Sequence, residues 1–309
     1  MLFGKSCLGR KPDYTIYHDS INQAEHLFLE NKNEESIALY KRIFEKYQFV
    51  FAKDCLIAGQ IALLFKDSSN AAFFTARAFQ QGVEIDYLLQ LTVYKAFMEQ
   101  EIWHNVVDSY VENRRIYFKS MDFERKKKWA ARYNLEQELK HVKTMPAYKT
   151  KMLENVNTVI QECKTIGFPG EKALGIDEST LTPTRSDIGI SCDVAYISLL
   201  HHGCSYDLLK KYFDTEIRKG NIHPRYCAYL ADFLKIIRQN ADMGCDTTTY
   251  PSAYIDFLNK MSDAEILKVN ELRAKLHICS VEQDRAKAQY EVKNGVKLSF
   301  GFGMNKGAL

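Results

Sequence analysis

The segment FLENKNEESIALYKRIF, residues 28–44, indicates how the first half of the chain folds. It aligns with LLFKDSSNAAFFTARAF, residues 63–79, at an offset of 35 positions, and more weakly with MEQEIWHNVVDSYVENR, residues 98–114. Each copy has the pattern of a helix end, a polar turn and the start of the next helix. Because one helical hairpin cannot bury its apolar stripe alone, we expect the hairpins to stack side by side.

Proline and glycine are distributed unevenly along the chain. None of the six prolines lies between Pro12 and Pro146, and only two glycines interrupt that range. Helix follows helix where such breakers are absent. We therefore predict an all-α protein with a helical-repeat domain at residues 13–145 and a helical domain of unknown function at residues 146–309. The charged segment at residues 116–145 is expected to be one helix that caps the repeats.

The period and the small side chains at Ala38, Ala71, Ala72 and Ala76 resemble the tetratricopeptide repeat family. The resemblance covers roughly residues 15–115, without the family's Trp-Leu-Gly-Tyr pattern or the proline that closes each repeat. It implies a solenoid whose concave groove holds a peptide or a partner helix. We accordingly expect a protein–protein interaction or adaptor protein. The expected partner-binding residues are aromatic: Tyr40, Phe44, Phe74, Phe79, Trp103 and Tyr110.

In the second half, apolar side chains recur at helical spacing before Gly167, which stands at the expected end of a helix. Residues 168–190 are rich in Gly, Pro, Thr and Ser, and we predict a long loop there. Three further helices are expected to start near Ser191, Ser205 and Pro224. These helices are predicted to pack around one core.

The C-terminal region is predicted to contain a long helix. Ser262 and Glu265 have the spacing of a capping box, and apolar residues then recur every three or four positions. We expect one helix of about thirty residues, which either lies across the helical domain or pairs with another helix. The first arrangement is favoured because Cys279 and Gln283 interrupt the apolar seam. Residues 296–309 are expected to form a short strand or a flexible end.

The motifs GFPGEK, HH and AYLADF resemble those of an uncharacterised bacterial domain family over about residues 150–255. His201 and Phe233 replace the family's glutamine and arginine, and CDT at residues 245–247 stands where Tyr-Gly-Thr is expected. The family carries no activity that can be transferred. The matching positions are Gly167, Pro169, Gly170, His202, Ala228, Tyr229, Leu230 and Asp232.

An alternative function is an enzyme or a metal-binding module that uses His202, Cys204, His223 and Asp232 under the loop at residues 168–190. Imidazole and thiolate are preferred zinc ligands, and His202 with Asp232 is the candidate catalytic pair. The favoured interpretation is structural, with the imidazole of His202 hydrogen-bonded to Asp232 or to a backbone carbonyl. No phosphate-binding loop, G-x-S-x-G or H-E-x-x-H motif occurs in the sequence, and no cofactor is expected.

Composition limits the remaining classes of function. Apolar residues make up 46% and charged residues 26% of the chain, and the formal net charge is +3, so we expect a globular protein without a nucleic-acid partner. The basic run at residues 125–128 is interpreted as a solvated helix face. The eight cysteines form no C-x-x-C pair, which is typical of reduced thiols. We recognise no signal peptide or membrane span, so a cytoplasmic location is expected.

Overall fold

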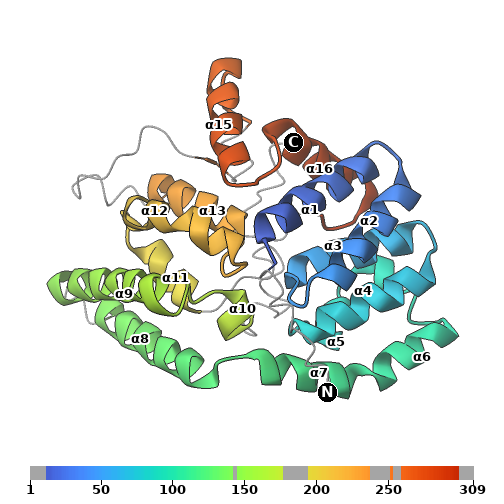
Figure 1. Ribbon diagram of the computed structural model, residues 1–309, viewed down its shortest axis with the longest axis horizontal. Helices are drawn as coiled ribbons and strands as arrows, with labels where there is room; N and C mark the ends of the chain where they lie inside the picture. Colours follow the sequence, from blue (N-terminus) through green and yellow to red (C-terminus); the bar gives the residue numbers. More distant parts are fainter. Residues whose placement is uncertain (1–11, 142–144, 177–193, 237–250, 253–258, 299–309) are drawn as a thin grey trace, which may run out of the picture.

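The computed structural model describes residues 12–141, 145–176, 194–236, 251–252 and 259–298. Every element of regular secondary structure in these ranges is a helix (Figure 1), which confirms the all-α prediction for this part of the chain. No helix in the same ranges is both long enough and apolar enough to span a bilayer.

Two helical hairpins form the first part of the fold. Helices α1 (Tyr14–Leu29) and α2 (Asn33–Lys46) make the first hairpin, and α3 (Ala52–Leu64) and α4 (Ser68–Gln80) make the second. The hairpins lie beside each other in Figure 1, and α2 contacts both α3 and α4. The two segments aligned in the sequence are therefore neighbours in space.

The turns of the two hairpins are equivalent at the offset of 35 positions. Asn31 in the first turn and Lys66 in the second both adopt left-handed backbone conformations, with φ of 62° and 59°. A single left-handed residue is a common way to end a helix. The helices that follow begin at Asn33 and Ser68, again at corresponding positions. The sequence repeat is thus a repeat of local backbone structure.

The third copy of the repeat differs from the first two. Two short elements, α5 (Ile85–Leu88) and η1 (Thr92–Tyr94), stand where a long first helix is expected. Helices α6 (Glu101–Asp108) and α7 (Tyr110–Ser120) then follow with one residue between them, and both pack against α4. The structure therefore contains two equivalent hairpins, and their extension into a tetratricopeptide-like solenoid stays a prediction.

The expected capping helix at residues 116–145 is broken, and this correction has a local cause. Helix α7 ends at Ser120, and α8 begins at Phe123. Between them, the carboxylate of Asp122 accepts a hydrogen bond from the backbone N–H of Arg125 at 3.0 Å. Asp122 thereby caps the start of a new helix.

The second group of helices packs around its own hydrophobic cluster, which contains Trp129. The expected loop at residues 168–190 begins with a short helix and a buried Ile176, and residues 177–190 lie outside the described ranges. The division of the chain at residue 145 stays a prediction. The helices are α8 (Phe123–His141), α9 (Met145–Thr165), α10 (Glu171–Leu174), α11 (Val194–His201), α12 (Ser205–Arg218) and α13 (Pro224–Ile236).

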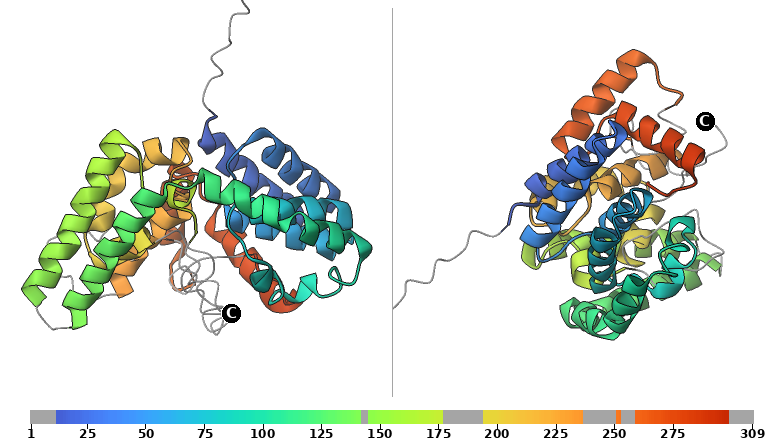
Figure 2. Two further views of the ribbon diagram at one scale, coloured as in Figure 1. Left: turned by 90° about the horizontal axis from the view of Figure 1, so that it is seen from below. Right: turned by 90° about the vertical axis from the view of Figure 1, so that its right-hand side faces the viewer.

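The two groups of helices lie side by side, with α7 running along one edge (Figures 1 and 2). Gly220, at the end of α12, allows one close approach between them. Its φ is 71°, and a Cβ added there would lie 2.6 Å from Cγ of Tyr14. Glycine is required here both for the left-handed backbone and for the contact with the ring.

The predicted long C-terminal helix is two helices, α15 (Asp263–Lys275) and α16 (Val281–Asn294). The capping box of Ser262 and Glu265 is confirmed at the start of α15. The break follows at His277, whose φ is 59°, and the side chain of Ser280 caps α16 by accepting from the N–H of Gln283 at 3.2 Å. Helix α16 packs beside α1, so the first and last helices of the described chain are neighbours (Figure 1).

Candidate functional site

The aromatic residues predicted to bind a partner are mostly in the core. Five of them expose between 0% and 7% of their surface, and all five belong to the first hydrophobic cluster. Their rings stabilise the hairpins and have no surface to offer to a partner in this conformation. The five are Tyr40, Phe44, Phe74, Phe79 and Trp103.

Tyr110 is placed differently, because it lines an open hollow on the surface of α7. The hollow has a volume of about 560 Å³ and is also lined by Val111 and Phe118. Val111 is 74% exposed and Phe118 is 41% exposed. Large apolar side chains that remain this exposed next to one another are characteristic of interaction surfaces.

Basic side chains surround the apolar surface of the hollow. The guanidinium of Arg114 lies 4.9 Å from the ring centroids of Tyr117 and Phe118. It also donates to the carbonyl of Gly82 at 2.5 Å, which holds it in place. Lys119 lines the hollow as well, as does Arg115, which pairs with the exposed Glu112 at 3.1 Å. The hollow therefore combines an apolar floor with a positively charged rim, and we call it the α7 surface.

The alternative site predicted from the sequence is not assembled as a metal centre. Among the residues that the structure describes, no group of three or more His, Cys, Asp or Glu side chains is arranged to hold a metal ion. Those residues include His202, Cys204, His223 and Asp232. The structure places these four side chains in different local environments.

His202 and Cys204 interact with each other through the backbone. His202 is 7% exposed, and its Nδ1 accepts from the N–H of Cys204 at 3.2 Å. Burial lowers the pKa of His202, which favours this neutral, accepting imidazole. Cys204 is disulfide-bonded, which corrects the expectation of a reduced thiol at this position, whereas Cys55, Cys163, Cys227 and Cys279 are free. It therefore has no thiol that His202 can activate.

Asp232 and His223 both adjoin a set of buried polar residues that the sequence did not reveal. The carboxylate of Asp232 accepts from the hydroxyl of Ser252 at 2.6 Å. The carbonyl of Ser252 in turn accepts from Arg273 at 2.6 Å. Through Ser252, Asp232 thus adjoins a cluster of buried charges.

We define this ionic cluster as Glu25, Arg225, Arg273, Asp284 and Lys287. The carboxylate of Asp284 pairs with both guanidinium groups and lies 3.0 Å from the ammonium of Lys287. Lys287 also pairs with Glu25 at 2.8 Å. The cluster connects helices α1, α13, α15 and α16, and its five side chains are at most 12% exposed.

Electrostatic attraction decides the charge state of Asp284. Burial alone raises the pKa of a carboxyl group. The neighbouring Arg225, Lys287 and Arg273 outweigh that effect and hold the pKa of Asp284 well below its usual range. Asp284 is therefore ionised and serves as the common anion of the cluster.

A small cavity lies next to the ionic cluster and is lined by His18, Lys53 and His223. The two imidazole rings meet edge to face, with centroids 4.9 Å apart. The Nε2 atom of His18 is buried and has no hydrogen-bond partner among the described residues. The cavity volume is about 10 Å³, which is roughly the space for one water molecule. It is too small for an organic substrate.

Three buried groups, of which only Lys53 lines this cavity, have pKa values displaced towards neutrality. Burial lowers the pKa of Lys53 to about 8 and raises the pKa of Asp54 to about 6. Burial also raises the pKa of Glu171 to about 8, and this carboxyl accepts from the N–H of Ala52 at 2.6 Å. Displaced pKa values often mark catalytic sites. Here all three groups are buried and the only cavity that any of them lines has room for one water molecule, so we assign them a structural role.

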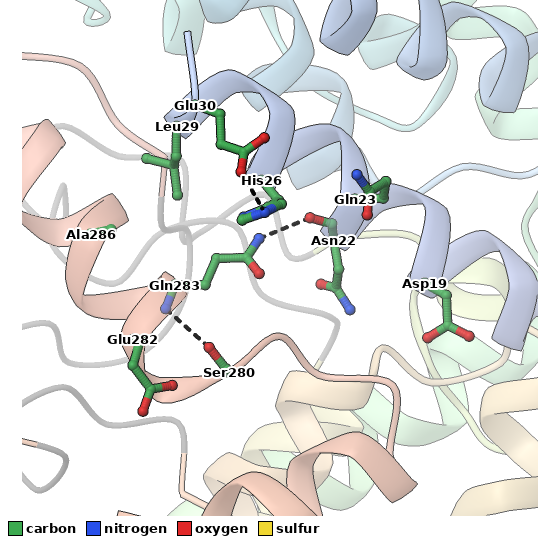
Figure 3. Close-up of a pocket in the computed structure, with 10 residues that line it drawn as sticks. All are labelled: Asp19, Asn22, Gln23, His26, Leu29, Glu30, Ser280, Glu282, Gln283 and Ala286. Atoms are coloured by element: carbon green, nitrogen blue, oxygen red, sulfur yellow. Dashed lines mark hydrogen bonds and ion pairs between the residues drawn. The ribbon is translucent and has the colours of Figure 1, made fainter. Parts of the chain in front are cut away.

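A second open groove runs between α1 and α16 (Figure 3) and has a volume of about 560 Å³. Polar side chains line most of it. His26 pairs with Glu30 at 3.1 Å on the α1 side, and Gln283 reaches across from α16 to donate to the carbonyl of Asn22 at 2.8 Å. The groove follows the line along which the first and last helices meet.

Comparison with known proteins assigns no family to the chain. No family model matches the sequence, and no curated protein or solved structure matches it either. The resemblances to tetratricopeptide repeats and to a bacterial domain family therefore stay predictions.

Proposed function

We propose that this protein is an interaction or adaptor protein that binds an acidic, amphipathic helix of a partner on the α7 surface. The observation that carries the proposal is the combination of Val111, 74% exposed, with a basic rim around it. A partner helix with a stripe of apolar residues would bury Val111 and Phe118. Glutamate or aspartate beside that stripe would meet Arg115 and Lys119.

Further features support an interaction surface in this region. Exposed large apolar side chains recur from α6 to the start of α8, and the rings of Phe118 and Phe123 stack with centroids 6.1 Å apart. Within α7, Val111 and Phe118 are two turns apart and lie on one face. The two equivalent hairpins support the tetratricopeptide-like interpretation, in which the α7 surface replaces the predicted groove as the contact for a peptide. The exposed side chains are Val107, Val111, Ile116, Phe118 and Phe123.

Binding of synthetic peptides tests this proposal directly. A labelled amphipathic helix with a leucine stripe flanked by glutamates is titrated with the protein, and fluorescence anisotropy is measured. We expect binding that weakens as salt is added, because the rim charges are exposed and screened. The substitution Val111→Asp should weaken binding by about ten-fold or more, since it places a charge in the apolar floor.

Two controls make the test specific. A peptide with lysines in place of the glutamates should bind far more weakly than the acidic one. Leu267→Asp changes an apolar side chain of α15 that is 64% exposed and distant in sequence from α7, so it should leave binding unchanged. Equal binding of the two peptides, or equal loss of binding in both variants, would show that the α7 surface is not the site.

A further inference from the structure

Four contacts connect α1 with α16 and with His277, which lies just before α16. His277 pairs with Asp19 at 2.9 Å, Gln283 donates to the carbonyl of Asn22 at 2.8 Å, and Lys287 pairs with Glu25 at 2.8 Å. One turn further along, the rings of Tyr290 and Phe28 meet edge to face at 4.7 Å. On α16 the contacting positions 283, 287 and 290 are spaced by four and three residues and lie on one face, whereas the α1 positions step by three and turn gradually around that helix. These contacts are Asp19–His277, Asn22–Gln283, Glu25–Lys287 and Phe28–Tyr290.

The segment after α16 continues onto α3 as an extended chain. The side-chain amide of Gln60 donates to the carbonyl of Lys297 at 2.6 Å and accepts from its N–H at 3.0 Å. Val296 and Leu298, on either side, are 3% and 2% exposed and belong to the first hydrophobic cluster. Main-chain hydrogen bonds with apolar side chains in pockets are the usual means of binding an extended peptide.

The interface of α16 is held more by charge than by apolar area. Of its five buried residues, Val281 and Ala288 are apolar, whereas Asp284, Lys287 and Glu291 are charged. A buried ion pair is costly to leave half-made, so only a segment that supplies the same charges can take the place of α16. The open groove of Figure 3 also leaves one side of the α1–α16 contact accessible. Such an interface can be exchanged for a similar one.

From these contacts we propose that residues 277–298 occupy a binding face formed by α1 and α3. A segment of another protein with similar side chains displaces them from this face. The segment that fits is a helix with an aspartate for Arg225 and Arg273, a lysine three positions later for Glu25, and an aromatic residue three positions after that for Phe28. An extended stretch with two apolar side chains follows it and pairs with Gln60. This surface is separate from the α7 surface and does not depend on the function proposed for it.

A labelled peptide of residues 280–298, titrated with the full chain, tests the inference. In the wild type the tethered segment competes at an effective concentration of about millimolar, so the peptide should bind weakly. Lys287→Glu places like charges beside Glu25 and Asp284 and should release the tethered helix while leaving α1 and α3 unchanged. We expect the peptide to bind this variant at least ten-fold more tightly than the wild type.

A second variant and two controls make the outcome decisive. Tyr290→Glu should release the segment through the contact with Phe28, without altering the ionic cluster. A peptide carrying the Lys287→Glu change should not bind, and Gln60→Ala should weaken the binding of the unchanged peptide. The inference is supported if at least one release variant keeps its helical circular dichroism and gains affinity for the peptide. If neither does, residues 277–298 are an integral part of the core and the inference is overturned.

Discussion

Asp284→Asn is expected to lower the free energy of unfolding by about 3–5 kcal/mol, the usual cost of removing one partner from a buried ion pair. The amide cannot balance the charges of Arg225, Arg273 and Lys287, which all lie beside the carboxylate. Urea unfolding at pH 7, followed by circular dichroism, measures the loss. The exposed Glu282 on the same helix provides a control, and Glu282→Gln should change stability by less than about 0.5 kcal/mol.

The same variant has a predictable dependence on pH. The pKa of Asp284 is lower in the folded than in the unfolded protein, so its contribution is present above the unfolded value of about 4 and is lost as the pH falls through the folded value. The difference in stability between the wild type and Asp284→Asn should therefore shrink below about pH 4. A difference that stays constant into acid would contradict the ionised state of Asp284.

Glu171→Gln is expected to increase stability at alkaline pH. The folded pKa of Glu171, about 8, lies above its unfolded value. The stability that the bound proton contributes is therefore fully present at low pH and is lost as the pH rises through about 8. The wild type should lose roughly 1.4 kcal/mol per pH unit from this group between about pH 5 and 8. Glutamine stays neutral and can still accept from the N–H of Ala52, so the variant lacks this loss.

Unfolding at several pH values between 5 and 9 checks this prediction. The variant and the wild type should be similar near pH 5 and should differ by several kcal/mol at pH 9, because the folded pKa of about 8 lies far above the unfolded value. Asp54 and Lys53 interact electrostatically with Glu171, so the comparison uses the pH dependence that is lost in the variant and not the absolute stability. Glu154 is exposed, so Glu154→Gln should follow the wild type. Parallel curves for Glu171→Gln and the wild type would show that the carboxyl is ionised throughout.

The helical architecture could be read from local patterns, because such patterns act over a few residues. Gly167 adopts φ of 96° after α9, Pro224 begins α13, and the capping box of Ser262 is formed. The two breaks that were missed also had local signals. Asp122 and Ser280 are good helix-capping residues, and Ser280 has glutamine three positions later, as in a capping box.

The ionic cluster could not be predicted in the same way. Glu25 and Lys287 are separated by 262 positions, and no periodicity relates them. Similarly, the sequence identified aromatic residues of the repeat correctly as apolar but did not distinguish a core position such as Phe74 from a surface position such as Tyr110. That distinction depends on which face of each helix its neighbours cover, which is decided by tertiary packing.

The pairing of α1 with α16 also has a consequence for synthesis of the chain. At about 5–20 residues per second, a ribosome needs roughly 13–50 s to add the 262 positions between Glu25 and Lys287. During that interval the nascent hairpins emerge with Glu25 lacking the ammonium group that it contacts in the finished fold. The contact between α1 and α16 therefore forms late in synthesis, after the hairpins of α1 to α4 have been translated.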